Sequence, residues 1–199
     1  MSVDAQVIDG ESFFNSPFRR FVAVMAAAAI LLAVVYISLQ ARSTAGLALS
    51  KEKAAAGMAA YKKGAFAKAA ASLQEAVKLN PKNAKAQSAL GQSYEATGKL
   101  DRAAKAYQDS LAVDANQPEV MYNLAIIHKA QNKNKEAITE LEKAIKLNQK
   151  FVAARLILGD LYALQNQKDK AGVQYQAVLE MKPFGTDLAE IKRKLEGLK

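Results

Sequence analysis

Apolar residues follow two different patterns along this chain of 199 residues. The first is an unbroken apolar run, FVAVMAAAAILLAVVYISL, over residues 21–39, which contains no charged residue. As an α-helix it would cover roughly 28 Å, close to the hydrocarbon thickness of a bilayer. The second pattern begins near residue 50, where apolar residues recur at spacings of three and four, which is typical of amphipathic helices. Both patterns predict helix, so we expect an all-α protein.

The apolar run predicts a transmembrane signal anchor over residues 19–42, which contains Arg19 and Arg20 at one end and Arg42 at the other. The run is longer than the apolar core of a cleaved signal peptide, which has about 7–15 residues. Small residues at 43–45 nevertheless keep cleavage, and release as a periplasmic protein, as an alternative. The adjacent arginine pair favours a cytoplasmic N-terminus and an exported C-terminal part. The Ala-rich composition and the layout of one anchor followed by repeats favour the inner membrane of a bacterium.

The segments beside the anchor are predicted to be simple. Residues 1–18 have no periodicity and are expected to form a flexible tail, and residues 43–49 are expected to form a short linker.

The anchor itself contains two alanine pairs at a spacing of four residues, one of which is Ala23 and Ala27. This spacing could allow weak self-association of the anchor.

From residue 50 onward, similar residues recur every 34 positions without insertion or deletion. One column contains small residues that would let two helices approach closely: Gly57, Gly91, Ala125 and Gly159. A second column contains only alanine: Ala69, Ala103, Ala137 and Ala171. A third contains residues that tolerate left-handed backbone geometry at a helix end: Gly64, Gly98, Asn132 and Asn166. A period of 34 residues with two helices per unit predicts stacked helix–turn–helix repeats.

These columns resemble four tetratricopeptide repeats, at residues 50–83, 84–117, 118–151 and 152–185. The resemblance implies a right-handed α-solenoid that binds protein partners and contains no catalytic residues. The tryptophan column of the family is absent, since the chain has no Trp. Residues 186–199 contain Leu188, Ile191 and Leu195 on one helical face, which predicts a helix that caps the end of the solenoid.

The resemblance also implies that the first helix of each repeat lines a concave surface for a partner. The residues of this sequence at those positions are Met58, Tyr61, Lys62, Ser88, Gln92, Glu95, Tyr122, Asn123, Ile126, Lys129, Leu156, Ile157, Asp160 and Leu164. Their mixture of apolar, amide and charged groups suits an extended peptide or an amphipathic helix. Alternatively, Ile126, Leu156 and Ile157 belong to the solenoid core.

Some tetratricopeptide co-chaperones bind a C-terminal carboxylate in a clamp of lysine, asparagine and arginine side chains. The matching positions here are Ala54, Met58, Ala89, Glu119 and Asn123. Only Asn123 fits that clamp, so we expect no carboxylate clamp in this protein.

Composition narrows the possible chemistry. The absence of Cys and the single His128 argue against thiolate or histidine metal sites and against cysteine nucleophiles, so no metal, cofactor or enzymatic activity is expected. His128 occupies the column of Tyr94 and Tyr162 and is expected to be a core residue. The net charge of +9 lies entirely in residues 50–199, where acidic and basic residues interleave without a nucleic-acid motif. No nucleic-acid partner is expected, whereas acidic proteins or anionic lipids could be attracted.

Together, these features predict a membrane-anchored scaffold or adaptor of a bacterial cell, which works in assembly or export of an envelope complex. A docking receptor that faces the cytosol and recruits client proteins to the membrane is the alternative.

Overall fold

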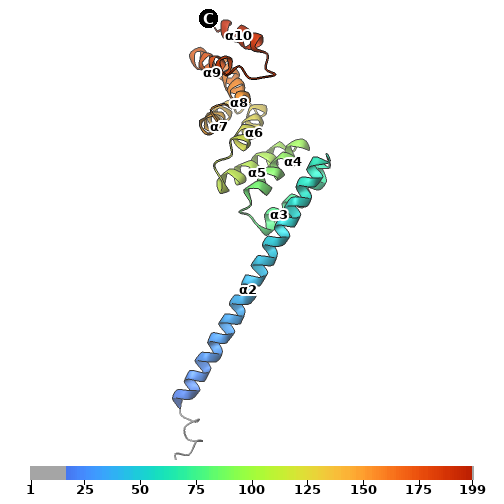
Figure 1. The fold of residues 1–199 in the computed structure, drawn as a ribbon, viewed down its shortest axis with the longest axis vertical. Coiled ribbons are helices and arrows are strands. Elements are labelled where there is room, and N and C mark those ends of the chain that lie inside the picture. The colour runs from blue at the N-terminus through green and yellow to red at the C-terminus, as the bar shows by residue number, and fades with distance from the viewer. Residues whose placement is uncertain (1–16, 199) are drawn as a thin grey trace, which may run out of the picture. The chain divides into compact units, whose positions relative to one another are not determined.

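The computed structural model describes residues 17–198, and every regular element in that range is an α-helix (Figure 1). The chain divides into two compact units, residues 1–48 and residues 49–199. The predicted tail over residues 1–18 lies outside the described part of the chain except for its last two positions.

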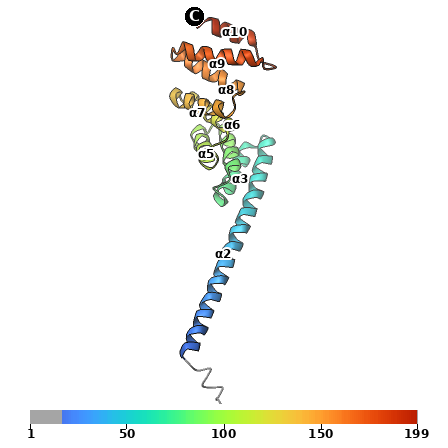
Figure 2. The ribbon, with the colours of Figure 1, turned by 60° about the vertical axis from the view of Figure 1, so that its left-hand side comes forward.

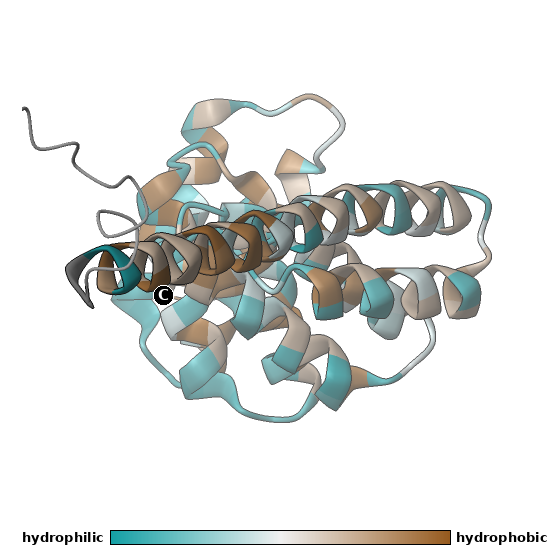
Figure 3. Ribbon diagram, turned by 90° about the horizontal axis from the view of Figure 1, so that it is seen from below, coloured by the Kyte–Doolittle hydropathy of each residue, from teal (hydrophilic) through white to brown (hydrophobic). Residues whose placement is uncertain are grey.

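Helix α2 (Pro17–Lys62) begins in the first unit and contains the apolar run. Every residue from 21 to 40 is exposed, including Leu32 at 71%, and Figure 3 shows the hydrophobic colouring concentrated in this half of the helix. By length and composition, α2 is the one described helix that could cross a bilayer, a criterion that signal sequences also meet. The segment expected to link the anchor to the repeats, residues 43–49, is helical and lies within α2.

The second unit consists of helices packed in successive pairs, visible from two directions in Figures 1 and 2. The end of α2 packs against α3, α4 against α5, α6 against α7, and α8 against α9. Their bounds are α3 (Phe66–Leu79), α4 (Ala84–Ala96), α5 (Leu100–Val113), α6 (Pro118–Ala130), α7 (Asn134–Leu147), α8 (Val152–Leu164) and α9 (Lys168–Met181). Neighbouring pairs stack on one another, which forms the solenoid expected from the 34-residue period.

Each pair turns at a residue with left-handed backbone geometry. The φ angles are 75° at Gly64, 72° at Gly98, 59° at Asn132 and 59° at Asn166. After each of these residues, the next backbone N–H donates back to the first helix; the N–H of Lys99, for example, donates to the Tyr94 carbonyl at 2.9 Å. This bond satisfies a carbonyl left unpaired at the helix end. The turns therefore form where the sequence predicts them.

One alanine in the second helix of each pair is completely buried. Ala69, Ala103, Ala137 and Ala171 are each 0% exposed. Such small side chains let the backbones of paired helices approach, and larger residues of the same helices, such as Leu141 and Tyr175, fill the remaining core. The buried residues form two clusters, one from α2 to α6 and one from α6 to α10, and each extends over more than one pair, as expected for stacked repeats.

Helix α10 (Leu188–Glu196) covers the last pair by packing against α9. Asp187 caps its start, and the carboxylate accepts from the backbone N–H groups of Ala189 and Glu190 at 2.9 and 3.1 Å. Ile191 is 3% exposed within the core, and Leu195 packs against the same cluster. The predicted capping helix is therefore present.

Candidate functional site

A groove of about 440 Å³ lies between the end of α2 and helix α4. The residues that line it are Met58, Tyr61, Lys62, Lys85, Ser88, Ala89, Gln92 and Gln117. Five of them are among the residues that the sequence predicts to face a partner, and all of them belong to the second unit. The structure thus gathers five of the six candidates of the first two repeats at one place.

Helix periodicity places these side chains on the groove. Lys85, Ser88 and Gln92 follow one another at spacings of three and four along α4, so they share one face. The start of α4 is fixed by Asn83, whose side-chain oxygen accepts from the Ala86 N–H at 3.1 Å. On α2, the ring of Tyr61 forms an edge-to-face pair with the ring of Phe66, with centroids 5.1 Å apart, which helps to hold the tyrosine beside the groove.

Sequence reasoning missed three lining residues: Lys85, Ala89 and Gln117. Lys85 lies one turn before Ser88, so the helical spacing continued by one turn could have identified it. Gln117 precedes α6 and is positioned by the turn between α5 and α6, because its amide nitrogen donates to the Asp114 carbonyl at 2.7 Å and to the Ser110 carbonyl at 3.2 Å. No feature of the repeat pattern predicts that contact.

Two predicted residues, Glu95 and Asn123, lie outside the lining of the groove and meet at the hydroxyl of Tyr107. The hydroxyl donates to the Glu95 carboxylate at 2.7 Å, and the Asn123 amide donates to the same oxygen at 3.5 Å. Burial raises the pKa of Tyr107, so the phenol keeps its proton and remains a donor. These contacts connect α4, α5 and α6, so both side chains already have partners within the protein.

Asp160 has a similar internal role at the other end of the solenoid. Its carboxylate accepts from the Tyr175 hydroxyl at 2.7 Å and from the Lys194 ammonium at 2.9 Å. The hydrogen bond to Asp160 raises the pKa of Lys194. Asp160 therefore joins α8 to α9 and α10.

The remaining candidates are divided between core and surface. Tyr122 packs against the core, with its ring centroid 5.1 Å from that of Phe151. Leu156 and Ile157 also pack against the buried cluster, as the alternative assignment of these residues to the core requires. Three others complete the set: Ile126 is half-buried, Lys129 is exposed, and Leu164 is 71% exposed.

Comparison with known families gives the repeats their name. The tetratricopeptide repeat model matches residues 54–119 and 122–186, which together are well over half of the chain. The chain belongs to the tetratricopeptide repeat family. Proteins of this family act as protein-interaction scaffolds.

Relatives and solved structures share the repeat fold. The DnaJ homolog subfamily C member 3 of Homo sapiens is 30% identical over 106 residues, which are 53% of this chain and 21% of that protein. The chain therefore spans about a fifth of the length of that relative. The crystal structure of MamA superposes with a TM-score of 0.69 at 23% identity, covering 75% of this chain and 80% of that one. YrrB, a TPR protein with an unusual peptide-binding site, has a TM-score of 0.64 at 21% identity, over 71% and 72% of the two chains.

Other features of the tetratricopeptide repeat unit do not gather predicted residues. A second depression of about 610 Å³ is lined by residues of α3 and by Leu90, and contains none of the predicted partner-facing residues. Within residues 17–198, no group of three or more His, Asp or Glu side chains could hold a metal ion. His128 is 9% exposed at its expected core position, and burial lowers its pKa.

Proposed function

We propose that the protein is a membrane-anchored tetratricopeptide scaffold that binds a peptide or an amphipathic helix of a protein partner in the groove between α2 and α4. The observation that carries the proposal is the groove itself, which brings Met58, Tyr61, Lys62, Ser88 and Gln92 together. Its volume of about 440 Å³ lies within the range of ligand pockets in proteins. The proposal gives the protein no catalytic role.

The proposed anchor is the apolar run of α2. A soluble core helix would bury such residues, yet residues 21–40 are all exposed in this chain. Burial in lipid would remove this apolar surface from water, and Arg20 and Arg42 mark the two ends of the span. With the arginine pair in the cytoplasm, the repeats lie outside the inner membrane of a bacterium and hold components of an envelope complex during assembly or export.

Site-specific photo-crosslinking tests the groove. A photoreactive amino acid at Gln92 is expected to give a discrete crosslinked partner in the native membrane. The same amino acid at Gln108, an exposed residue of α5 outside the groove, is the matched control and is expected to give none. Equal adducts at both positions, or none at Gln92, would show that the groove is not the binding site.

Cysteine labelling tests the anchor and its orientation, because the natural sequence contains no Cys. Lys192→Cys places one thiol on an exposed position of α10. Labelling of intact cells by a maleimide that crosses only the outer envelope is expected if the repeats are exported. Labelling only after lysis would instead support the cytosolic docking receptor, and recovery of a shortened, soluble chain would support the cleaved form.

A further inference from the structure

The geometry points to an acidic segment that inserts a large apolar side chain as the occupant of the groove between α2 and α4. The apolar side chain would enter beside Met58 and Ala89, and carboxylates on either side of it would lie over Lys62 and Lys85. This inference rests on the proposed function and specifies the chemistry of the partner.

The floor of the groove suits an apolar side chain. Met58 is 37% exposed, and the half-buried Tyr61 and Ala89 lie beside it in the lining. Burial of these groups by a partner would remove apolar surface from water on both sides of the contact. The flexible thioether of methionine adapts to aliphatic and aromatic side chains alike, so the floor selects for size and apolarity more than for one residue type.

The charged lining of the groove has one sign. Lys62 and Lys85 are exposed and line it, and no acidic residue does. The one acidic residue of α4 is Glu95, and its carboxylate accepts a hydrogen bond from the hydroxyl of Tyr107. Neither Lys62 nor Lys85 takes part in an ion pair among residues 17–198. Carboxylates of a partner would therefore meet Lys62 and Lys85 without competition from an ion-pair partner in the described part of the chain.

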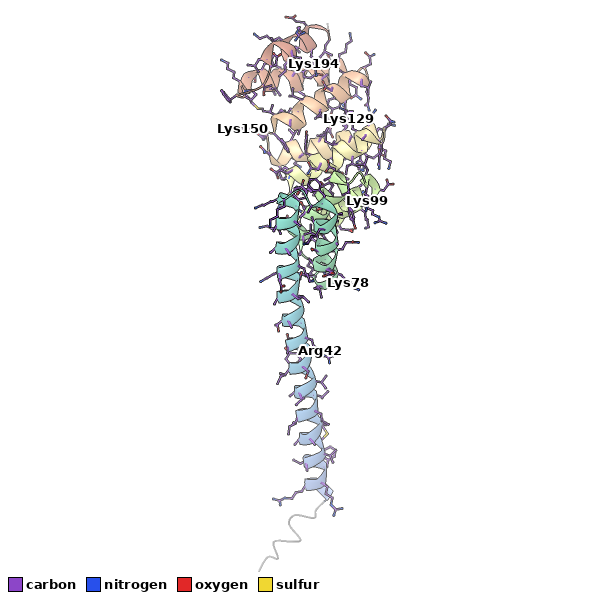
Figure 4. The ribbon with its side chains drawn as sticks, turned by 90° about the vertical axis from the view of Figure 1, so that its right-hand side faces the viewer. Arg42, Lys78, Lys99, Lys129, Lys150 and Lys194 are labelled. Carbon is purple, nitrogen blue, oxygen red and sulfur yellow. The ribbon has the colours of Figure 1, made fainter. Side chains whose placement is uncertain are left out.

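Two further features favour an acidic partner. The first turn of α4 contains no acidic residue, so the partial positive charge of the helix N-terminus adds to that of Lys85. Residues 50–83 contain seven lysines and two glutamates, so this repeat has a net charge of +5 out of the total +9. Figure 4 shows that other lysines are distributed along the whole repeat unit. The field of this first repeat would steer acidic segments toward the groove.

The neutral polar groups of the lining suit a peptide. Ser88, Gln92 and Gln117 present hydroxyl and amide groups around the apolar floor. Such groups can pair with the backbone N–H and C=O groups of an extended segment, which carry no sequence information. Specificity would then come from the apolar floor and from the two lysines.

Peptide binding to the full chain in detergent micelles tests the inference by charge exchange. The labelled peptide EELLEE is expected to bind by fluorescence anisotropy, and KKLLKK is not. Lys62→Glu with Lys85→Glu is expected to weaken EELLEE about tenfold or more and to give KKLLKK measurable binding, because the sign of the rim is reversed. Ala89→Phe, which fills the groove, is expected to abolish binding of both peptides.

The matched control is Lys63→Glu with Lys82→Glu, which changes the net charge equally at two exposed positions outside the lining. An equal loss of EELLEE binding in the control would overturn the inference, because it would show only general attraction by a basic surface. A second result would also overturn the inference. If the Lys62/Lys85 variant no longer bound anionic phosphatidylglycerol vesicles but kept its affinity for EELLEE, the two lysines would bind lipid and not a peptide. A crosslinked partner at Gln92 that is unaffected by this charge reversal would leave the scaffold function intact and remove only the acidic specificity.

Discussion

The ring of Tyr107 lies directly against the backbone of Gly91. A Cβ atom at residue 91 would come within 2.6 Å of two ring carbons, closer than carbon atoms pack in proteins. The same relationship joins Gly159 and Tyr175, also at 2.6 Å. Both rings are almost completely buried. Glycine at residues 91 and 159 therefore makes room for the tyrosine that fills the core of the α4–α5 pair and of the α8–α9 pair.

Gly91→Ala is therefore expected to destabilise the repeat unit. Overpacking costs about 1–3 kcal/mol and alanine returns about 1 kcal/mol through its higher helix propensity, so we expect a net loss of about 1 kcal/mol. Thermal unfolding followed by circular dichroism measures the loss as a lower Tm. Gly172→Ala is the control, because its Cβ would be 3.6 Å from Leu195, an ordinary contact, and should leave the Tm unchanged or higher. A parallel decrease in both variants would contradict the close-contact explanation.

The alanine column gives a second prediction. Ala103→Leu and Ala137→Leu add volume at positions that are 0% exposed, and each is expected to lower the free energy of unfolding by about 1–3 kcal/mol. Ala112→Leu, at an exposed position on α5, makes the same change outside the core and should have little effect. Chemical denaturation of the three variants checks the expectation. Unchanged stability in both buried variants would mean that the helices can separate to accept leucine.

The hydroxyl of Tyr107 gives a prediction about alkaline pH. Burial raises the pKa of Tyr107 above its ordinary value of 10.0, so above that pH the unfolded chain loses the proton first. The stability linked to this proton is complete below pH 10 and is lost as the pH rises further. Tyr107→Phe should cost about 1 kcal/mol at pH 7 through loss of the hydrogen bond to Glu95, and the difference from the natural protein should shrink at pH 11. A constant difference across this range would contradict the linkage.

His128 gives the opposite dependence. Burial lowers its pKa below the ordinary value of 6.5, so the unfolded chain binds the proton more readily than the folded one. The stability linked to His128 is therefore fully present above about pH 6.5 and is lost as the pH decreases below that value. His128→Tyr, the residue found at the same position of the neighbouring repeats, should reduce this acid sensitivity. The measurement is the melting temperature of the natural protein and of the variant at pH 7.5 and 5.5. If the melting temperature fell equally in both proteins, the acid sensitivity would come from groups other than His128.

The local elements of this protein follow from the sequence with few exceptions. The 34-residue period predicts the paired helices, and residues such as Asn132 and Asn166 mark the turns where the backbone adopts positive φ. This success has a physical reason: each repeat makes the same short-range contacts, so one pattern repeated in register specifies all of them. The apolar run of α2 is equally evident from the sequence, where residues 21–39 contain no charge, and residues 21–40 are all exposed in the structure.

The tertiary structure alone decided which polar side chains are available to a partner. The sequence places Glu95, Asp160 and Gln92 on first helices, where they look alike. In the structure, Tyr107 and Tyr175 reach across from the second helices and bind Glu95 and Asp160, whereas Gln92 lines the groove. Periodicity determines the face on which a residue lies, but a hydrogen bond between two helices depends on the lengths and directions of both side chains. Those contacts exist only once the helices are packed together.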